Sequence, residues 1–457
     1  MLDFMDNAPA TKTKEEKKLE SLMEEKQQFM NQQTKKYLES LFEENSHKPI
    51  VLQNVHILNS EDFRNEFLIK QFLPLNKRHF TLSSFFQSID EVSTNLSKST
   101  ALTNLEIDLN TQGNNDKLIA SPIFKLVPVK KFFAKTGSNI GNGEGDGYIQ
   151  FQWRNIFGGG ENLSFDATTG TRTTASYLLN YSMPWFNKSL IRFDTSAYFN
   201  SRSMEWINSE TVNRGITTKF TSSFKHFNFN FQIDNIWRNL HNLNSKSWDV
   251  ITQSGPNFKS AVSASVNFDD RDNVHLPTKG RFFQLGVEAN GLIPQADKFI
   301  KTMIEGQFAV PLNKYHHLIL TSKSGLLVSE KTSYILDRFF IGGPNDVRSF
   351  MLNGLGPKSY GDSLGGDIFL NGGVSLVSSV PRYPESNFKF HNFINWGSLK
   401  LLDEHFLKHQ FSIGYGFGIL YNHPMARFEL NFVLPLTSHQ RDSIRKGLQY
   451  GIGVSFL

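Results

Sequence analysis

The chain has 457 residues, with 48 lysines and arginines against 43 aspartates and glutamates, and it has no cysteine. The absence of cysteine excludes a disulfide scaffold, a CxxC redox site and a cysteine-based zinc site. A net charge of +5 is too small for this length to indicate nucleic-acid binding, so no nucleic-acid partner is expected. No stretch approaches the about 20 consecutive apolar residues of a transmembrane helix. The N-terminus lacks the apolar core of a secretory signal and is too acidic for a matrix transit peptide. One membrane class stays open, the β-barrel, whose alternating strands average to a near-neutral hydropathy.

Residues 1–47 are expected to form a charged extension, helical or disordered. Between residues 11 and 45 the chain is rich in Glu, Lys, Gln and Leu, and its apolar residues recur at helical spacing in one narrow stripe. The stripe consists of Leu19, Leu22, Met23, Met30, Tyr37, Leu38, Leu41 and Phe42. Two interpretations stay open: a solvated or partly disordered extension, and a helix that docks on a partner.

Residues 48–130 predict a small α+β domain with the order β-α-α-β-β. Alternation predicts the strands, while Ser60 as a helix cap and Pro74 as a helix terminator bound the first helix. The expected elements are a strand over Val51–Leu58, a helix over Glu61–Leu73, a second helix from Thr81 or Ser83 through Leu96, and strands over Ala101–Asn110 and Lys117–Val129.

From residue 131 to residue 457 the pattern becomes a series of strands with period-2 alternation and turn residues between them. In the clearest segment, one face carries Ala426, Phe428, Leu430, Phe432, Leu434 and Leu436, and the other carries Arg427, Glu429 and Asn431. We expect about 16 such strands, which suits membrane strands of about 9–11 residues. They lie near residues 131–140, 147–155, 161–171, 174–185, 189–201, 210–223, 226–238, 257–268, 281–291, 299–311, 316–328, 367–379, 387–398, 410–421, 425–436 and 447–457.

The fold class predicted by this series is mainly β: a 16-stranded antiparallel transmembrane β-barrel over residues 131–457, preceded by one α+β domain. A closed barrel removes the sheet edges that lipid could not solvate. A series of soluble β-sandwiches is the alternative.

Motifs for catalysis are weak throughout. Residues 361–365 read GDSLG and match the nucleophile elbow, but that elbow needs a strand-to-helix turn, and here the motif lies in a Gly-rich loop between strands. The run of glycines at residues 141–147 resembles a phosphate loop, but no helix follows it, so a hairpin turn is expected. The 13 histidines show no metal-ligand spacing. We therefore expect no enzyme, no catalytic residue, no cofactor and no metal.

One loop stands out by its length, roughly 38 residues between Val328 and Asp367, because loops that long are uncommon unless functional. Its centre holds Arg348 between Val347 and Phe350. A disordered surface loop is the simpler interpretation, but the loop is too apolar for that. We expect it to fold back into the barrel, with Arg348 held by the polar inner wall.

At this loop the sequence resembles a known family. The string FFIGGPNDVRSF, followed by GLGPKS and GGD, resembles the loop-6 motif of the outer-membrane barrel insertase superfamily, which includes the bacterial barrel-assembly protein. The motif residues are Asp346, Val347, Arg348, Ser349 and Phe350, with Ser349 where the family usually has Gly. Residues 48–130 then resemble a single polypeptide-transport-associated (POTRA) domain, and residues 269–280 resemble a family turn. The last 36 residues resemble fungal members of the mitochondrial branch, the barrel subunits of the sorting and assembly machinery.

The resemblance implies a function without bond chemistry: insertion of β-barrel precursors into the mitochondrial outer membrane, with the POTRA domain in the intermembrane space. Implied partners are barrel precursors, two peripheral cytosol-facing subunits, the lipid bilayer and other barrel copies. A lateral gate would open between the first strand, at Phe132, Phe133, Ala134, Lys135 and Thr136, and the last, at Gln449, Tyr450, Gly451, Ile452 and Gly453. The chain's own insertion signal would comprise Gln449, Gly451, Val454 and Phe456.

Two other functions stay open, a polypeptide- or solute-conducting channel and a purely structural barrel.

One departure from the family concerns the partner of Arg348. In bacterial relatives this Arg pairs with carboxylates on the inner wall of the next strands, and the matching stretch here offers Asn395 where an Asp is expected. An amide accepts a hydrogen bond without adding charge. We therefore expect a weaker anchor or a carboxylate from another segment.

Overall fold

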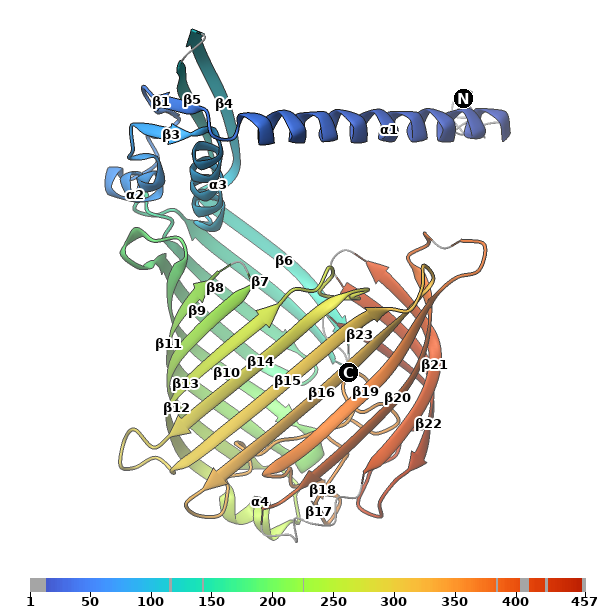
Figure 1. Cartoon of the computed structure of the whole chain (residues 1–457). Helices are drawn as coiled ribbons and strands as arrows, with labels where there is room; N and C mark the ends of the chain where they lie inside the picture. The colour runs from blue at the N-terminus through green and yellow to red at the C-terminus, as the bar shows by residue number, and fades with distance from the viewer. Residues whose placement is uncertain are drawn as a thin grey trace, which may run out of the picture. The chain divides into compact units, whose positions relative to one another are not determined.

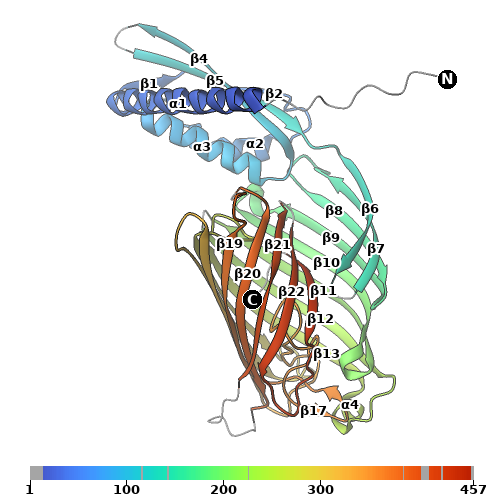
Figure 2. The same cartoon turned by 90° about the vertical axis from the view of Figure 1, so that its right-hand side faces the viewer.

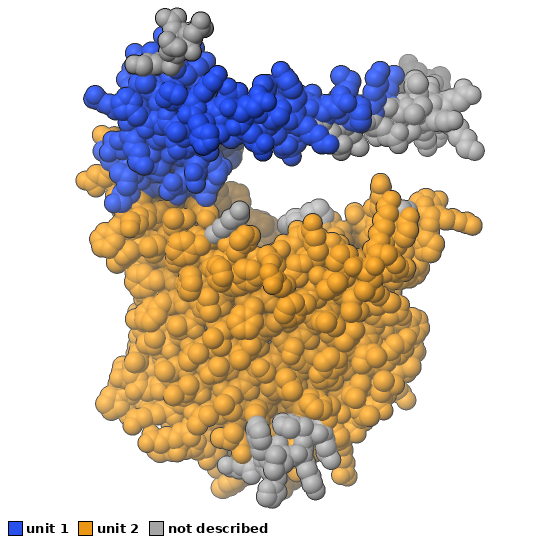
Figure 3. Space-filling view, viewed as in Figure 1, with its two compact units in different colours: residues 1–61, 68–97, 102–128 blue, residues 62–67, 98–101, 129–457 orange. Residues whose placement is uncertain are grey.

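The structure is a computed structural model that describes residues 14–114, 117–141, 144–224, 226–383, 385–402, 411–423 and 426–453. The chain divides into two compact units, coloured separately in Figure 3. The first comprises residues 1–61, 68–97 and 102–128, and the second comprises residues 62–67, 98–101 and 129–457. Two short segments inside the predicted α+β domain thus belong to the unit of the barrel. Within the described ranges, no helix is both long and apolar enough to cross a membrane.

The first unit is an α+β module, as predicted (Figure 1). Its sheet has the order β2-β5-β1-β3, with β4 also paired to β5. Its elements are α1 (Lys14–Asn45), β1 (Pro49–Leu52), β2 (His56–Leu58), α2 (Asn65–Gln71), a 3-10 turn (Leu73–Leu75), β3 (His79–Thr81), α3 (Leu82–Lys98), β4 (Leu102–Asn114) and β5 (Lys117–Pro128); the second unit includes parts of α2 and α3. Buried apolar side chains such as Ile50, Phe85 and Phe124 form its core.

Three details of the predicted module are wrong. The single strand expected over Val51–Leu58 is two strands, β1 and β2, which both pair with β5. Ile50 pairs with Leu118 and His56 pairs with Ile123, so the chain between Ile50 and His56 has one residue more than β5 has between the two partners. This extra residue interrupts the strand. The helix expected over Glu61–Leu73 spans only Asn65–Gln71, and Ser60 does not cap it. The short strand β3 was not predicted, because three residues are too few to show an alternation.

Helix α1 follows the predicted helical spacing over Lys14–Asn45. Most of its described apolar side chains are exposed, with Met23 and Phe29 each 60% exposed. Near its end, Phe42 contacts Phe86 of α3 edge-on, with 5.7 Å between ring centroids. The docking interpretation of this helix stays a prediction.

The second unit is built on a 16-stranded sheet in which each strand is antiparallel to its neighbours in chain order (Figures 1 and 2). The predicted strand number is confirmed. The strands are β6 (Phe132–Gly141), β7 (Glu144–Arg154), β8 (Asn162–Gly170), β9 (Thr173–Pro184), β10 (Ile191–Met204), β11 (Ser209–Ser223), β12 (Phe227–Asn242), β13 (Gly255–Asp269), β14 (Gly280–Asn290), β15 (Phe299–Pro311), β16 (His316–Ser329), β19 (Ile368–Ser379), β20 (Phe388–Lys400), β21 (Ser412–His423), β22 (Ala426–Thr437) and β23 (Gly447–Gly453). The predicted hairpin at residues 141–147 is the β6–β7 turn, and residues 142–143 lie outside the described residues.

The two faces of this sheet have opposite polarity. On β22, Leu430 is 48% exposed on the outer face, while Glu429 and Asn431 are buried on the inner face. Apolar side chains outside and polar side chains inside are the pattern of a membrane barrel and the reverse of a soluble sandwich. The sandwich alternative is therefore wrong.

The two end strands of the sheet, β6 and β23, lie near each other. Between the residues described on these strands there is no hydrogen-bonded ladder, and each pairs only with its chain neighbour, β7 or β22. The long connection between β16 and β19, residues 330–367, is called the lumen loop below. It contains the short strands β17 (Lys358–Ser359) and β18 (Asp362–Ser363).

Candidate functional site

The lumen loop packs against the inner wall of the barrel. Its apolar residues share one buried cluster with residues of β15, β16, β19 and β20. The loop contributes Phe339, Ile341, Val347, Phe350 and Leu355, and the wall contributes Phe299, Leu327, Phe369 and Leu399. Because these side chains are at most 7% exposed, the loop is a packed plug rather than a surface segment.

Arg348 is a fully buried side chain at the centre of this plug. Its Nη2 donates to both carboxylate oxygens of Glu429 on β22, at 2.9 and 3.1 Å, and its Nε donates to Oε2 at 3.2 Å. Nη1 lies 3.4 Å from Oδ1 of Asn395 on β20, and the guanidinium stacks 4.6 Å from the ring centroid of Phe393. The carboxylate partner of Arg348 is thus Glu429, and Asn395 adds a neutral acceptor.

Glu429 is positioned by the alternation of β22, which places Arg427, Glu429 and Asn431 on the same inner face. Arg427 Nε donates to Glu429 Oε1 at 2.7 Å, and Asn431 Nδ2 donates to Oε2 at 2.7 Å. Sequence reasoning placed Glu429 on the polar face but did not single it out. A signal was present: an acid between Arg and Asn on the inner face of a membrane strand.

The rest of the predicted loop motif has two contrasting environments. The carboxylate of Asp346 accepts hydrogen bonds from Gly342 N–H at 2.8 Å and from Asn371 Nδ2 at 2.5 Å. Burial raises the pKa of Asp346, although the hydrogen bond from Gly342 opposes the shift. Ser349 has φ of 78°, in the region that favours glycine, and its Oγ has no hydrogen-bond partner among the described residues. The family's Gly at this position would fit the backbone with less strain.

Three backbone hydrogen bonds connect the lumen loop to the segment that leads into β23. Met351 N–H donates to the Ser443 carbonyl at 2.9 Å, and Ser443 N–H donates to the Gly354 carbonyl at 2.8 Å. Arg445 N–H donates to the Ser349 carbonyl at 2.9 Å. Since β23 begins at Gly447, the anchored loop and the last strand are joined within a few residues of each other.

The predicted gate residues lie on the two end strands. On β6, the range Phe132–Thr136 pairs with β7, and on β23, the range Gln449–Gly453 pairs with β22. Gln449 and Gly451 are buried, whereas Tyr450 is 51% exposed on the outer face. Both amide atoms of Gln449 are buried without a hydrogen-bond partner in the described part of the chain. Val454 and Phe456, predicted for the insertion signal, lie outside the described residues.

The GDSLG segment forms part of the lumen loop. Asp362 accepts hydrogen bonds from Asn208 Nδ2 and Ser245 Oγ, both at 2.5 Å, and Ser363 is buried in the β17–β18 ladder. These contacts describe a structural turn. Over the residues that the structure describes, no group of three His, Cys, Asp or Glu side chains is arranged to hold a metal ion.

An antiparallel sheet with an apolar outer face, near-adjacent end strands and an arginine-anchored plug defines a transmembrane β-barrel protein with an internal loop. The chain belongs to the Omp85 superfamily, whose domain matches residues 155–456. The family resemblance in the sequence is thereby confirmed.

Relatives and solved structures agree with this assignment. The chain is 29% identical to a Sam50-like protein of Schizosaccharomyces pombe, over 95% of this chain and 96% of that one. It is also 29% identical to the sorting assembly machinery 50 kDa subunit of Saccharomyces cerevisiae, over 73% of this chain and 76% of that one. In fold, it is similar to BamA from Haemophilus ducreyi lacking POTRA domains 1–3, with a TM-score of 0.72, 13% identity and coverage of 88% and 84%.

Proposed function

We propose that this protein inserts β-barrel precursors into the mitochondrial outer membrane, through a lateral gate between β6 and β23. The observation that carries the proposal is the seam, where the described residues of β6 and β23 form no ladder, together with the loop bonded to the segment before β23. The names of the relatives support it, because they are subunits or components of a sorting and assembly machinery.

The physical basis is β-augmentation. An open edge presents backbone N–H and C=O groups that lipid cannot satisfy, so a precursor strand is favoured there. Backbone hydrogen bonds provide affinity for many sequences, and an alternating apolar face sets the register. On β23, the amide of Gln449 has no hydrogen-bond partner among the described residues, so it is a polar group that a new arrangement of strands could satisfy.

The proposal extends to surroundings and partners. The α+β module acts as a POTRA domain in the intermembrane space, and the barrel assembles with two peripheral subunits that face the cytosol. The last strand also serves as the chain's own insertion signal, so that insertion of a new copy uses an existing one. No bond is made or broken in the substrate.

The test uses purified protein in liposomes and two engineered cysteines, because the chain has none of its own. One cysteine is placed between Phe133 and Thr136, the other between Gln449 and Gly453, in several registers. A matched control joins Thr218→Cys to Ile233→Cys, two register partners inside the β11–β12 ladder. Oxidation at the seam should stop insertion of a precursor with a C-terminal strand, and reduction should restore it, while the control pair has no effect.

If the barrel with the locked seam inserted precursors as fast as the reduced barrel, the proposal of a lateral gate would be wrong. Leakage of a small solute is measured in the same liposomes. A channel would conduct the solute in the locked and the reduced states without inserting the precursor.

A further inference from the structure

We propose that Asp337 is a second anchor of the lumen loop, which holds the start of the loop to β12, β13 and β15 independently of the Arg348–Glu429 pair. Arg348 has a recognisable motif around it, and Asp337 has none. The inference concerns where the loop is held, so it stands or falls separately from the proposed insertase function.

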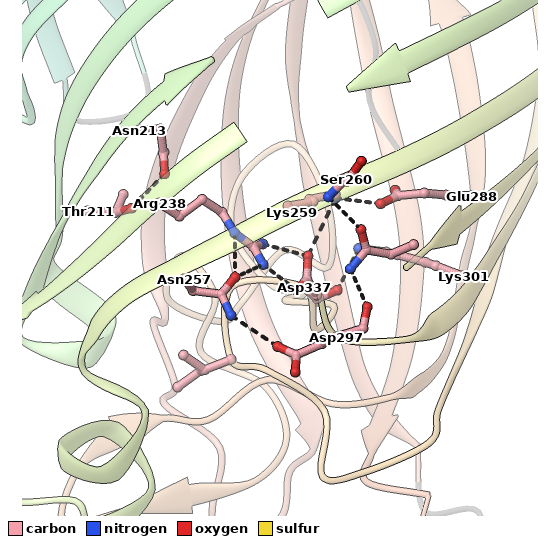
Figure 4. Close-up of polar contacts among 12 residues, drawn as sticks. Thr211, Asn213, Arg238, Asn257, Lys259, Ser260, Glu288, Asp297, Lys301 and Asp337 are labelled. Carbon is pink, nitrogen blue, oxygen red and sulfur yellow. Dashed lines mark hydrogen bonds and ion pairs between the residues drawn. The ribbon is translucent and has the colours of Figure 1, made fainter. Parts of the chain in front are cut away.

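The carboxylate of Asp337 is buried, with a side chain that is 1% exposed, and it meets two cations of the wall (Figure 4). Arg238 of β12 donates from Nη1 at 2.7 Å and from Nη2 at 3.0 Å, one bond to each oxygen. Lys259 of β13 donates from Nζ at 3.4 Å. A bidentate bond from Arg to a carboxylate fixes both the position and the orientation of the Asp337 side chain.

The main chain and a neighbouring ring of the loop are held at the same place. Lys301 of β15 donates from Nζ to the main-chain carbonyl of Asp337 at 2.7 Å. The guanidinium of Arg238 also lies 4.9 Å from the ring centroid of Tyr334, three positions earlier in the loop. Three strands of the wall thus bind a short stretch of the loop through its side chains and its backbone.

Asp337 supplies the negative charge that the cations of this cluster need. Three cations, Arg238, Lys259 and Lys301, surround Asp337, and Glu288 of β14 pairs with Lys259. Burial by itself would raise the pKa of Asp337, but the guanidinium of Arg238 and the nearby ammonium groups outweigh it and hold that pKa below its usual range. Asp337 therefore stays ionised at neutral pH. Without it, three partly buried cations would face one carboxylate.

The two anchors lie on different parts of the wall. Asp337 is held by β12, β13 and β15, whereas Arg348 is held by β20 and β22. No wall residue in the contacts described takes part in both. The stretch between the two anchors includes Ile341 and Val347 of the buried cluster. This stretch of the loop is therefore held to the wall at each of its ends. A variant that loses one anchor should keep the loop inside through the other.

The test measures how accessible the loop is to a water-soluble thiol reagent. Ile341→Cys, a residue 3% exposed between the two anchors, is introduced into the cysteine-free chain, and its labelling by a water-soluble maleimide is timed in the folded barrel. Asp337→Asn and Arg348→Ala are added singly and together. We expect each single variant to speed labelling by no more than about threefold. The pair should speed it by more than the product of the two single effects, at least about tenfold, because either anchor alone keeps the loop inside and only the loss of both releases it.

Three controls make the result decisive. Glu288→Gln removes a carboxylate from the same cluster but not from the loop, and it should leave labelling of Ile341→Cys unchanged. Ile319→Cys, on the inner wall and 3% exposed, should stay unlabelled in every folded variant. If Asp337→Asn did not fold, Arg238→Gln would remove the bidentate donor from the wall side and should give the same rates. If Arg348→Ala alone labelled as fast as the pair, Asp337 would not be an anchor.

Discussion

Arg427 and Glu429 lie two residues apart on β22, and Arg427 Nε donates to Glu429 Oε1 at 2.7 Å inside the barrel. Glu429 therefore serves two guanidinium groups, one from its own strand and one from the lumen loop. Arg427 Nη1 also reaches the main-chain carbonyl of His275, 3.5 Å away, in the turn between β13 and β14. This turn and the lumen loop enter from opposite ends of the barrel, as the alternation of antiparallel strands requires. The turn is thus linked to Glu429 through Arg427, and the lumen loop is linked to the same carboxylate through Arg348.

The first prediction ranks two substitutions at this carboxylate. Glu429→Gln leaves two buried guanidinium groups without a counter-charge, whereas Arg348→Ala leaves Glu429 still paired to Arg427. Breaking a buried ion pair from one side costs about 3–5 kcal/mol. We expect Glu429→Gln to lower barrel stability by about that amount and Arg348→Ala by less. Arg348→Ala should still fold but insert precursors more slowly.

The measurement is the temperature at which the folded barrel unfolds, read as a mobility shift on a gel. Glu330→Gln, which breaks an exposed pair with Lys298, is the control and should change little. A larger loss for Arg348→Ala than for Glu429→Gln would contradict this account of the charges.

The second prediction concerns the strained backbone at Ser349. Because its φ is 78°, Ser349→Gly should relieve about 1 kcal/mol of strain and raise the unfolding temperature. Nothing is lost with the hydroxyl, since Oγ has no hydrogen-bond partner among the described residues. An unchanged or lower unfolding temperature would show that the strain is relieved elsewhere.

The third prediction concerns the close approach of β21 to the same residue. A Cβ at Gly414 would lie 2.6 Å from the Arg348 carbonyl oxygen and 2.7 Å from Ser349 Oγ. Gly414→Ala should displace the anchored loop and cost about 1–3 kcal/mol, with faster maleimide labelling of Ile341→Cys. Gly286→Ala is the control, because its Cβ would meet no atom closer than 3.9 Å. Equal effects of the two substitutions would rule out the steric explanation.

The fourth prediction follows from the raised pKa of Asp346. The folded state binds a proton more tightly than the unfolded chain, whose Asp has a pKa of about 3.9. The stability that this residue contributes is therefore present below that pH and is lost as pH rises through the pKa of the folded state. Asp346→Asn mimics the protonated form, so it should raise stability at pH 7 and flatten the dependence on pH above about 4. Unfolding temperatures between pH 4 and pH 8 measure both effects, and an unchanged slope would exclude Asp346 as its source.

The fifth prediction separates two N-terminal deletions. Within the barrel unit, Asn155 Nδ2 donates to the Asp62 carbonyl at 2.9 Å, and Arg64 N–H donates to the Gly158 carbonyl at 2.8 Å. Deleting residues 1–128 removes these partners of the β7–β8 turn. We expect an inserted barrel that is less stable by about 1–3 kcal/mol and releases precursors more slowly. Deleting residues 1–45 keeps Asp62 and Arg64 and should leave the unfolding temperature of the barrel unchanged. If the barrel lacking residues 1–128 did not itself insert into the membrane, the barrel would need the module to fold.

The sequence by itself determined the sixteen strands and their two faces, because alternation with period two is a local signal and lipid requires the apolar face outside. It also singled out Arg348, a charge in the middle of a long apolar loop. Only the tertiary structure decided what holds that charge. Glu429 lies 81 positions away from Arg348, and Arg238 lies 99 positions away from Asp337. No periodicity extends over such separations, so these pairs become visible only when the sheet curls and brings distant strands to one lumen.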